Sequence, residues 1–301
     1  MEYRAPVESY SGKVREVTIG KGAKALKIGG ENALPFHFFD EGSIPNPPRF
    51  ALQVFDSKPE GWAKWVLEPF QDVIADPVKW AKKCLDYGAD AICLVLESTD
   101  PAGKNASADE AAQLAKKVAE AITVPLIVCG SKDDKKDAQV LSKVAEACKG
   151  ENLLIGPVVK ENYGAIAKAA ADNGHAIIAQ SPLDINLMKE LNIKLSKVFP
   201  ADRIVIDPLS SALGYGMEYT FTIMERTKQI GVIFKDAQTQ MPIIADVAGE
   251  CWKTKEAKES KEQGILWEGM TALSLLLAGA NLVVLRHPET LKLVKDTIKQ
   301  G

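Results

Sequence analysis

Polar side chains that could bind a ligand or transfer a proton follow several short apolar runs of this sequence. Four carboxylates stand at or just past the ends of such runs, at Asp56, Glu97, Asp207 and Asp246. A carboxylate can accept hydrogen bonds from ring N–H groups, and a protonated one can act as a general acid. Together with neighbouring hydroxyls, these residues predict a polar, uncharged-to-acidic surface that could hydrogen-bond a large flat heterocycle.

The same carboxylates could have a purely structural role, because a carboxylate at the end of a strand often caps the helix that follows. This alternative stays open for Asp56 and Asp246. Glu97 is followed by Ser98 and Thr99, which could provide the cap instead. A ligand-binding role is therefore favoured for Glu97.

Several other chemistries fit this sequence poorly. Of the three histidines, His175 begins an apolar run and is expected at the bottom of the fold, His37 lies in the N-terminal extension, and only His287, after the last run, is predicted to lie on the functional face. Metal-dependent hydrolases of the barrel type place several histidines together, so we predict no metal site. No lysine ends a run, and Lys132 is the nearest candidate for a Schiff base. Arg286-His287-Pro288 follows the last run, where a Gly-rich phosphate loop would be expected.

Five cysteines are spread along the chain, at Cys84, Cys93, Cys129, Cys148 and Cys251. No two have the spacing of zinc or iron–sulfur ligands, and the odd count with wide spacing argues against a disulfide framework. We expect Cys84, Cys93 and Cys148 to be buried thiols.

Eight apolar runs, separated by segments with helical periodicity, must position these side chains. Continuous runs of this length suit strands buried on both faces, as in a parallel sheet covered by helices. Eight such units in about 250 residues predict an α/β fold, a closed (β/α)8 TIM barrel, with its functional face at the C-terminal ends of the strands. The runs are residues 50–55, 89–96, 125–129, 152–156, 175–180, 203–207, 242–246 and 281–286.

Capping residues mark the predicted helix boundaries. Asp76-Pro77 predicts the start of a helix that ends at Tyr87-Gly88, and Ser107 with Glu110 resembles a capping box for a helix that reaches Ile122. Glycine follows several predicted helices, as is typical of helix C-termini. The remaining predicted helices are residues 135–149, 160–173, 182–191, 217–230, 264–278 and 288–299.

Residues 1–49 precede the repeat and are predicted to form an N-terminal extension, while residues 50–301 form the barrel. Within the extension, residues 13–19 and 23–28 alternate as strands, and Lys21-Gly22 between them predicts a β-hairpin. We expect this hairpin to cover the bottom of the barrel. A Pro-rich segment, residues 44–48, then gives a stiff connection to the first strand.

Two connections are longer than is usual for a barrel. The first, residues 56–76, carries Trp62, Trp65 and Phe70, which predict a docked helix, a lid or a partner surface, or else local packing onto the barrel rim. The second, residues 247–263, contains a run of lysines and glutamates that we interpret as a solvated helix face.

Composition limits the classes of partner. Lys plus Arg number 37 and Asp plus Glu 40, which gives a formal net charge of −3 and no electrostatic footprint for nucleic acid. The most apolar helical segment, residues 270–280, is far shorter than a membrane span, and residues 1–20 lack the apolar stretch of a signal peptide. We therefore expect a cytoplasmic protein that binds neither nucleic acid nor a membrane.

Three segments resemble a known family. They are Glu41-Gly-Ser-Ile-Pro-Asn-Pro-Pro48, Asp90-Ala-Ile-Cys-Leu-Val-Leu-Glu-Ser-Thr99 and Asp207-Pro-Leu-Ser-Ser-Ala-Leu-Gly-Tyr-Gly-Met-Glu-Tyr-Thr220. In these segments, and over nearly the whole chain, the sequence resembles the small subunit of the corrinoid iron–sulfur protein. That subunit is also called the delta subunit of acetyl-CoA decarbonylase/synthase.

The resemblance implies a barrel related to the pterin-binding methyltransferases, paired with a large subunit that carries a cobamide and a 4Fe–4S cluster. Together the two subunits would accept a methyl group from a methylated pterin, through transient contact with a methyl-tetrahydrofolate methyltransferase. They would deliver it to acetyl-CoA synthase in anaerobic acetyl-CoA metabolism.

This chain lacks the cobalamin-binding signature Asp-x-His-x-x-Gly, since Asn173-Gly174-His175 and Arg286-His287-Pro288 do not match it. Its cysteines are also unsuitably spaced for an iron–sulfur cluster. We therefore expect the cobamide to be held mainly by the large subunit, at the interface, and no Fe–S cluster to be bound by this chain.

Under this resemblance the barrel is a non-catalytic cover for the cobamide, and none of its residues acts as nucleophile or base. Glycine lacks a Cβ, so glycines near the mouth would let the backbone approach the corrin closely. The expected contacts with the corrin are Glu97, Ser98, Thr99, Gln180, Asp207, Ser210, Ser211, Gly214 and Gly216.

Two alternatives stay open, and both would make the chain an enzyme by itself. One is a free-standing pterin-dependent methyltransferase of the barrel type. Against it, the third and fourth runs end in Cys129-Gly130-Ser131 and Gly156-Pro157, without the amide or acid that binds the pterin in that related family. The other is a lyase-type barrel enzyme, for which the sequence shows no base–electrophile pair.

Overall fold

Eight parallel strands form one sheet that closes almost completely into a barrel. The strands are β3 (Arg49–Phe55), β4 (Ala91–Val95), β5 (Leu126–Cys129), β6 (Leu154–Val158), β7 (Ala176–Gln180), β8 (Ile204–Asp207), β9 (Ile244–Asp246) and β10 (Leu282–Leu285). In the computed structural model, which describes residues 3, 7–35 and 42–300, they follow the order β8-β7-β6-β5-β4-β3-β10-β9. The ends of the sheet meet where Ile206 and Ile243 form a parallel bridge. The predicted (β/α)8 barrel is confirmed.

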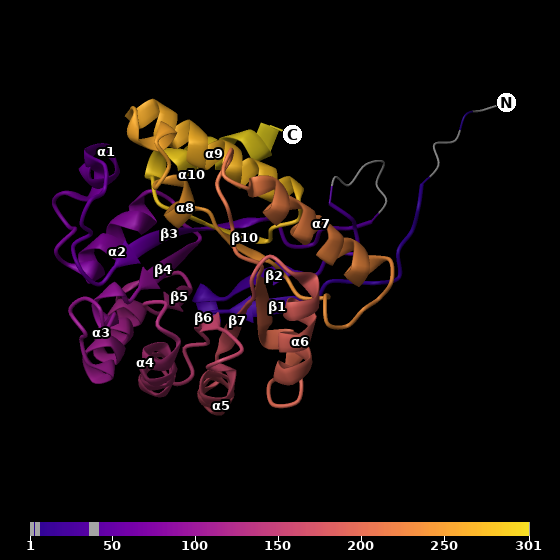
Figure 1. Cartoon of the computed structure of the whole chain (residues 1–301), viewed down its shortest axis with the longest axis horizontal. Coiled ribbons are helices and arrows are strands. Elements are labelled where there is room, and N and C mark those ends of the chain that lie inside the picture. Colours follow the sequence, from indigo (N-terminus) through magenta and orange to yellow (C-terminus); the bar gives the residue numbers. More distant parts are fainter. Residues whose placement is uncertain (1–2, 4–6, 36–41, 301) are drawn as a thin grey trace.

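Helices surround these strands on the outside of the barrel (Figure 1). Their burial patterns place an apolar stripe against the sheet and charged residues outside, as expected for amphipathic helices. The long helices are α2 (Pro77–Asp86), α3 (Ala108–Ala121), α4 (Asp134–Ala147), α5 (Tyr163–Asn173), α6 (Ile185–Leu195), α7 (Met217–Val232), α9 (Lys261–Leu277) and α10 (Pro288–Gln300). Two short helices, α1 (Lys64–Leu67) and α8 (Ala248–Cys251), lie in the two long connections.

The predicted helix starts at Asp76 and Ser107 are confirmed. The Asp76 carboxylate accepts from the backbone N–H groups of Val78 and Lys79 over 3.1 and 3.2 Å. Ser107 and Glu110 form a reciprocal capping box at the start of α3. Each cap satisfies N–H groups that the first helical turn leaves without partners.

The start of α6 differs from the prediction because its cap residue is Asp184. The Asp184 carboxylate accepts from the N–H groups of Asn186 and Leu187, so the helix begins at Ile185 rather than at residue 182. Two other helices also start at different residues: α5 begins at Tyr163, after Asn162, rather than at residue 160, and α9 begins at Lys261, after the cap residue Ser260, rather than at residue 264.

The fourth strand runs further than the sequence predicts. The apolar run was expected to end at Gly156, yet β6 continues through Pro157 to Val158. The pairing with β7 shifts register between Ile155 and Val158, which is the kind of irregularity that lets a sheet accept a proline without an N–H group. The loop that follows therefore begins at Val159, and Gly156-Pro157 belongs to the strand.

An antiparallel hairpin covers the bottom of the barrel, as predicted. It consists of β1 (Glu16–Ile19) and β2 (Leu26–Gly29), joined through a short 3-10 turn at Gly22–Lys24. Its buried side chains Val17, Ile19 and Ile28 pack in one cluster with inward residues from the N-terminal ends of the barrel strands. The second hairpin strand begins later than predicted because the 3-10 turn occupies its first residues.

A buried polar cluster fastens the rest of the extension to the barrel. The Lys228 ammonium of α7 donates to Glu31 and, over 2.7 Å, to Asn281 Oδ1, and Asn281 Nδ2 donates to Glu31 Oε1 over 2.9 Å. Pairing of this kind is what allows a charged lysine to be buried. His37, predicted to lie in the extension, falls outside the described residues.

The aromatic residues of the first long connection pack onto the barrel rim. Phe70 is fully buried, and its ring centroid lies 5.3 Å from that of Trp80. The ring centroids of Trp62 and Phe55 lie 4.9 Å apart. The indole N–H of Trp65 donates to Ala257 O over 3.3 Å, which links the two long connections. Among the alternatives left open by the sequence, the structure favours a docked helix with local packing.

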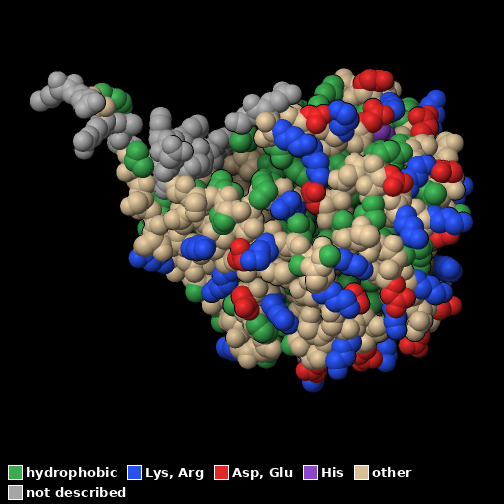
Figure 2. Space-filling model, turned by 180° about the vertical axis from the view of Figure 1, so that it is seen from behind, with side chains coloured by type: hydrophobic (Ala, Val, Ile, Leu, Met, Phe, Trp, Pro, Cys, Tyr) green, Lys and Arg blue, Asp and Glu red, His purple; other side chains and the backbone are tan. Residues whose placement is uncertain are grey.

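The second long connection presents its charges to solvent, as predicted. Lys253, Lys255 and Lys258 are exposed, while Thr254 and Ala257 between them are buried. Over the face seen in Figure 2, Lys and Arg side chains are interspersed with Asp and Glu, and neither sign forms a continuous area. Within the described part of the chain, every helix is too short or too polar to cross a bilayer.

Candidate functional site

A layer of polar side chains lies inside the barrel at the C-terminal ends of the strands. Side chains alternate between the two faces of a strand, so residues two apart share a face. The inward apolar residues Ala51, Ile178, Val205, Ile244 and Val284 are each followed two positions later by a polar residue. We call these five residues the polar floor: Gln53, Gln180, Asp207, Asp246 and Arg286.

Gln53 joins a positive and a negative side chain within this floor. Its Oε1 accepts from Nε and Nη2 of Arg286 over 3.1 and 2.8 Å, and its Nε2 donates to both oxygens of Asp246 over 3.1 Å. The Arg286 guanidinium also lies 3.8 Å from the ring centroid of Trp62, a cation–π contact. Burial lowers the pKa of Arg286 to about 10, so it remains a cation at neutral pH.

Asp207 is the other carboxylate of the floor and is held by a second glutamine. Gln180 Nε2 donates to Asp207 Oδ2 over 2.8 Å, and the Leu209 N–H donates to Oδ1 over 2.8 Å. Burial raises the pKa of Asp207 to about 6 and also raises that of Asp246. The two carboxylates therefore face the mouth with a higher proton affinity than exposed aspartates have.

Of the three expected contact residues after β4, only Glu97 has an exposed side chain. The Ser98 hydroxyl donates to Asp56 over 2.5 Å, and the buried Thr99 hydroxyl donates to Leu96 O over 2.7 Å. Asp56 also accepts from the Ser98 N–H over 2.9 Å, so its role is structural, although it bonds to the segment after β4 rather than capping the helix that follows β3. Asp246 combines both roles, because it accepts from the Ala248 N–H over 3.2 Å while facing Gln53.

The remaining expected contacts lie in the loop between β8 and α7. The Ser211 N–H donates to Thr220 Oγ1 over 3.1 Å, and the Ser210 hydroxyl is buried without a hydrogen-bond partner among the described residues. Gly214 and Gly216 have φ of 75° and 98°, a region that favours glycine. Backbone conformation alone thus explains why these two positions are glycine.

His287 is buried rather than open to the mouth. Its Nδ1 accepts from the Glu289 N–H over 3.2 Å, which leaves Nε2 to donate to Trp65 O over 3.2 Å. Burial lowers the pKa of His287 to about 4, so it is neutral. Its predicted place on the functional face is wrong, because the short helix α1 and its flanking loop cover it.

The thiols predicted to be buried are buried, since Cys84, Cys93 and Cys148 are at most 2% exposed. Cys93 lies inside the barrel with its Sγ 3.7 Å from that of Cys129, whose side chain is partly exposed. Across residues 3, 7–35 and 42–300, no three His, Cys, Asp or Glu side chains come together in a group that could hold a metal ion.

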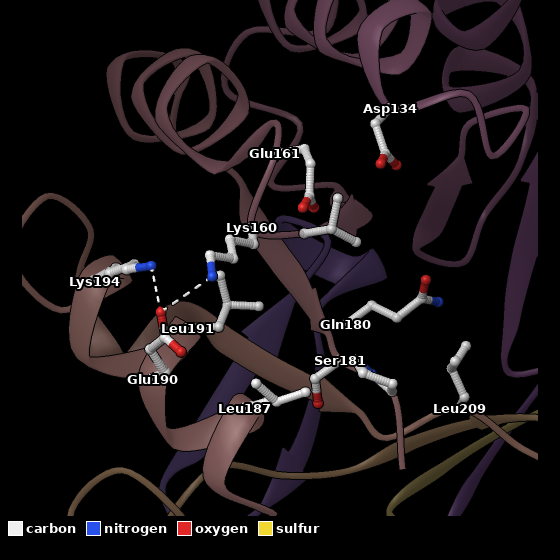
Figure 3. A pocket seen from close by; sticks show the side chains of 12 residues that line it. Asp134, Lys160, Glu161, Gln180, Ser181, Leu187, Glu190, Leu191, Lys194 and Leu209 are labelled. Atoms are coloured by element: carbon white, nitrogen blue, oxygen red, sulfur yellow. Dashed lines mark hydrogen bonds and ion pairs between the residues drawn. The ribbon is translucent and has the colours of Figure 1, made fainter. Parts of the chain in front are cut away.

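A cavity of about 360 Å³ adjoins the floor and shares Gln180 with it (Figure 3). Residues from the loops after β6, β7 and β8 and from α6 line it. This cavity could not be predicted from the sequence, because its walls come from segments far apart in the chain.

Residues 16–296 match the family model described as CO dehydrogenase/acetyl-CoA synthase delta subunit. This chain belongs to that delta-subunit family. The acetyl-CoA decarbonylase/synthase complex subunit delta of Methanothermobacter thermautotrophicus is 35% identical over 306 residues, which covers 98% of this chain and 77% of that protein. The corresponding subunit of Archaeoglobus fulgidus is 36% identical over 313 residues, which covers 96% and 68%. The resemblance stated from sequence motifs is confirmed.

Solved structures similar in fold to this delta-family chain include dihydropteroate synthases. The enzyme from Vibrio fischeri gives a TM-score of 0.61 at 14% identity and covers 86% of this chain and 96% of that one. The enzyme from Coxiella burnetii, solved with pteroic acid, gives a TM-score of 0.60 at 13% identity. The match covers 90% of this chain and 99% of that one. At these identities the likeness shows the barrel fold alone.

Sequence reasoning missed Gln53 and the role of Arg286 in this delta-family chain. The predicted contact residues lie at or just past the strand ends, whereas Gln53 lies two residues before the end of β3. The signal that could have found both is the period of two, which places a polar residue at the last inward position of several strands.

Proposed function

We propose that this chain is the small subunit of a corrinoid iron–sulfur methyl carrier, and that its barrel mouth covers a cobamide held mainly by a large subunit. The observation that carries this proposal is the polar floor. It presents a guanidinium donor and two carboxylate acceptors in one layer, and each carboxylate is held in place by a glutamine amide. Membership of the delta-subunit family supports the same function.

The residues present fit a corrin. A corrin bears several carboxamide side chains, and a carboxamide needs one hydrogen-bond acceptor and one donor side by side. The carboxamide of Gln53 occupies such a pair between Arg286 and Asp246, and a corrin carboxamide would use the N–H groups and lone pairs that these two residues have left. The buried Ser210 hydroxyl, which lacks a partner among the described residues, adds a further polar group at the mouth.

In this proposal, Glu97, Gln180, Asp207 and Asp246 accept hydrogen bonds from the carboxamides, and Arg286 donates to them. The cobamide, when bound, supplies the cobalt that carries the methyl group from a methylated pterin to acetyl-CoA synthase. The chain's own residues orient the corrin and exclude water from its exposed face. The loop of Ser211, Gly214 and Gly216 would contact the edge of the corrin, and a methyl-tetrahydrofolate methyltransferase and acetyl-CoA synthase would bind the complex in turn.

The direct test is co-purification with the cobamide-carrying subunit of a related complex. We expect the two chains to elute together in size-exclusion chromatography at micromolar concentration, with cobalt and iron in the shared peak. The chain purified alone should contain neither metal in stoichiometric amount. Separate elution of the two chains, or iron–sulfur absorbance in the isolated chain, would contradict the proposal.

A second candidate is a free-standing pterin-dependent methyltransferase, and the pair of carboxylates Asp207 and Asp246 is the observation that favours it. Such carboxylates could accept hydrogen bonds from the N–H groups of a pterin ring. Calorimetric titration of the isolated chain with a methyl-tetrahydropterin separates the two functions. Saturable binding would support the methyltransferase, and no binding would support the cover.

A further inference from the structure

Arg286 is a buried cation of the mouth, and its neighbours fix its position. Its side chain is only 6% exposed, and within the described residues its hydrogen bonds, from Nε and Nη2, both go to the neutral Oε1 of Gln53. It nevertheless stays charged at neutral pH. Burial of a charged group is costly unless its surroundings compensate, so the remaining contacts of the guanidinium decide how it can meet a ligand.

Trp62 covers one face of this guanidinium. The guanidinium carbon lies 3.8 Å from the centroid of the Trp62 ring and 5.6 Å from that of Phe55. At 3.8 Å the planar group is stacked on the indole in van der Waals contact. Among aromatic side chains, tryptophan attracts a cation over its face most strongly. The stack therefore restricts the plane of the guanidinium.

The Trp62 ring is itself held by other rings rather than by its own backbone. Residues 57–62 make no backbone–backbone hydrogen bond to the other residues that the structure describes. The Trp62 ring centroid lies 4.9 Å from that of Phe55, edge to face, and 6.4 Å from that of the buried Trp80. Trp62 thus joins the packed rim of the barrel to the polar floor.

One edge of the guanidinium remains free. Nη1 of Arg286 makes no hydrogen bond to the described residues, and it is not among their enclosed polar atoms that lack a partner, so it borders open space. Arg286 follows the inward residue Val284 by two positions, which places its side chain inside the barrel at the mouth. A guanidinium held by Gln53 at one edge and by Trp62 on one face therefore presents Nη1 to the mouth.

We propose that Trp62 positions Arg286 for ligand binding, with its indole holding the guanidinium plane so that Nη1 donates to a carboxamide oxygen of the bound corrin. This inference rests on the proposed function, because it names a contact of the cobamide that the mouth would cover. A donor that is already held in place loses little conformational freedom on binding, so its hydrogen bond contributes more to affinity. Trp62 acts through Arg286, without touching the ligand.

The first measurement uses the full chain alone, with isotope-labelled arginine. Trp62→Leu uncovers the guanidinium, so exchange of the Arg286 Nε–H proton with water, followed by NMR, should become about threefold to thirtyfold faster, the factor that corresponds to loss of a cation–π contact. Trp62→Phe keeps an aromatic face and should restore most of the protection. Trp65→Leu is the matched control in the same connection, since Trp65 is not among the described rings that contact Arg286, and it should leave the exchange unchanged. Unchanged exchange in Trp62→Leu would overturn the inference.

The second measurement is the affinity for the cobamide-carrying subunit of a related complex. Trp62→Leu should weaken association about threefold to thirtyfold, and Trp62→Phe should recover most of this loss. In an Arg286→Gln background, Trp62→Leu should add no further loss, because its effect passes through Arg286. An equal loss in both backgrounds, with circular dichroism showing folded variants, would reveal a merely structural role and overturn the inference.

The two measurements separate this inference from the proposed function. If wild type itself fails to associate, the proposed function is contradicted, together with the ligand named for Nη1. The exchange rates of the isolated chain still decide whether Trp62 holds Arg286. If wild type associates and Trp62→Leu associates equally well, the proposed function stands and the positioning role of Trp62 is refuted.

Discussion

At the scale of single residues, Gln53 separates the charges of Arg286 and Asp246, so this mouth has a guanidinium and a carboxylate joined through an amide. Gln53→Leu keeps similar volume but leaves both charged groups without that partner. A hydrogen bond to a charged group contributes about 1.5–3 kcal/mol, so we expect the free energy of unfolding to fall by about 3 kcal/mol. Urea denaturation measures this free energy of unfolding. Gln113→Leu, on the exposed face of α3, is the matched control and should change stability by less than about 0.5 kcal/mol. A fall below about 1 kcal/mol in Gln53→Leu would contradict the bridging role.

Asp207 makes a prediction about pH. Burial raises its pKa to about 6, above the value of about 3.9 in an unfolded chain. Between these values the folded chain holds a proton that the unfolded chain has lost, so the free energy of unfolding falls as pH rises through this window, by about 3 kcal/mol in total. Asp207→Asn lacks this titration. Urea denaturation at several pH values should therefore show that wild type loses stability relative to Asp207→Asn as the pH rises from about 4 to about 7. Parallel pH profiles of the two proteins would refute the raised pKa.

Residues just past strand ends could be predicted from the sequence, but their partners could not. Asp207 and Gln180 were expected at the mouth and lie in the polar floor. Asp56 and Ser98 were equally well placed by chain position, yet they bond to each other. Which carboxylate faces a ligand depends on contacts across neighbouring strands, and one sequence does not contain that information.

At the scale of elements, local signals fixed most boundaries because capping is local chemistry. Ser107 and Asp76 begin helices where the sequence predicts, since their partners lie within three residues. β6 was misjudged because Pro157 is normally excluded from a strand, and only the pairing with β7 reveals the register shift that accommodates it. His287 was misplaced for a similar reason, because the segment that covers it lies more than 200 residues earlier, at Trp65.

The capping box of α3 gives a prediction at this scale. Ser107→Ala removes the hydroxyl that accepts from the Glu110 N–H, and loss of such a cap costs about 1 kcal/mol. Ser142→Ala is the matched control inside α4, where the hydroxyl bonds back to Ala138 O and adds no capping. Thermal or urea denaturation should show a loss of stability for Ser107→Ala alone. Equal stability of the two variants would contradict a role for the capping box.

At the scale of the whole molecule, the hairpin and the polar floor close opposite ends of one barrel. Ile28→Ala would open a cavity at the bottom and should lower the free energy of unfolding by about 2–4 kcal/mol, without weakening contacts at the mouth. Association with the proposed cobamide-carrying subunit should therefore be unchanged at temperatures where the variant is folded. Stability within about 1 kcal/mol of wild type would show that the hairpin does not seal the core.

The central claim is that this barrel covers a cobamide without taking part in bond making. It is tested most directly by methyl-transfer rates of Glu97→Gln and Asp207→Asn in the complex reconstituted with the large subunit. Loss of one hydrogen bond costs about 0.5–1.5 kcal/mol, so we predict rates lowered roughly threefold to tenfold. Loss of a general acid or base lowers a rate by about 10²–10⁴. A drop of about a thousandfold in either variant, with the heterodimer intact by size exclusion, would contradict the account and make the barrel catalytic.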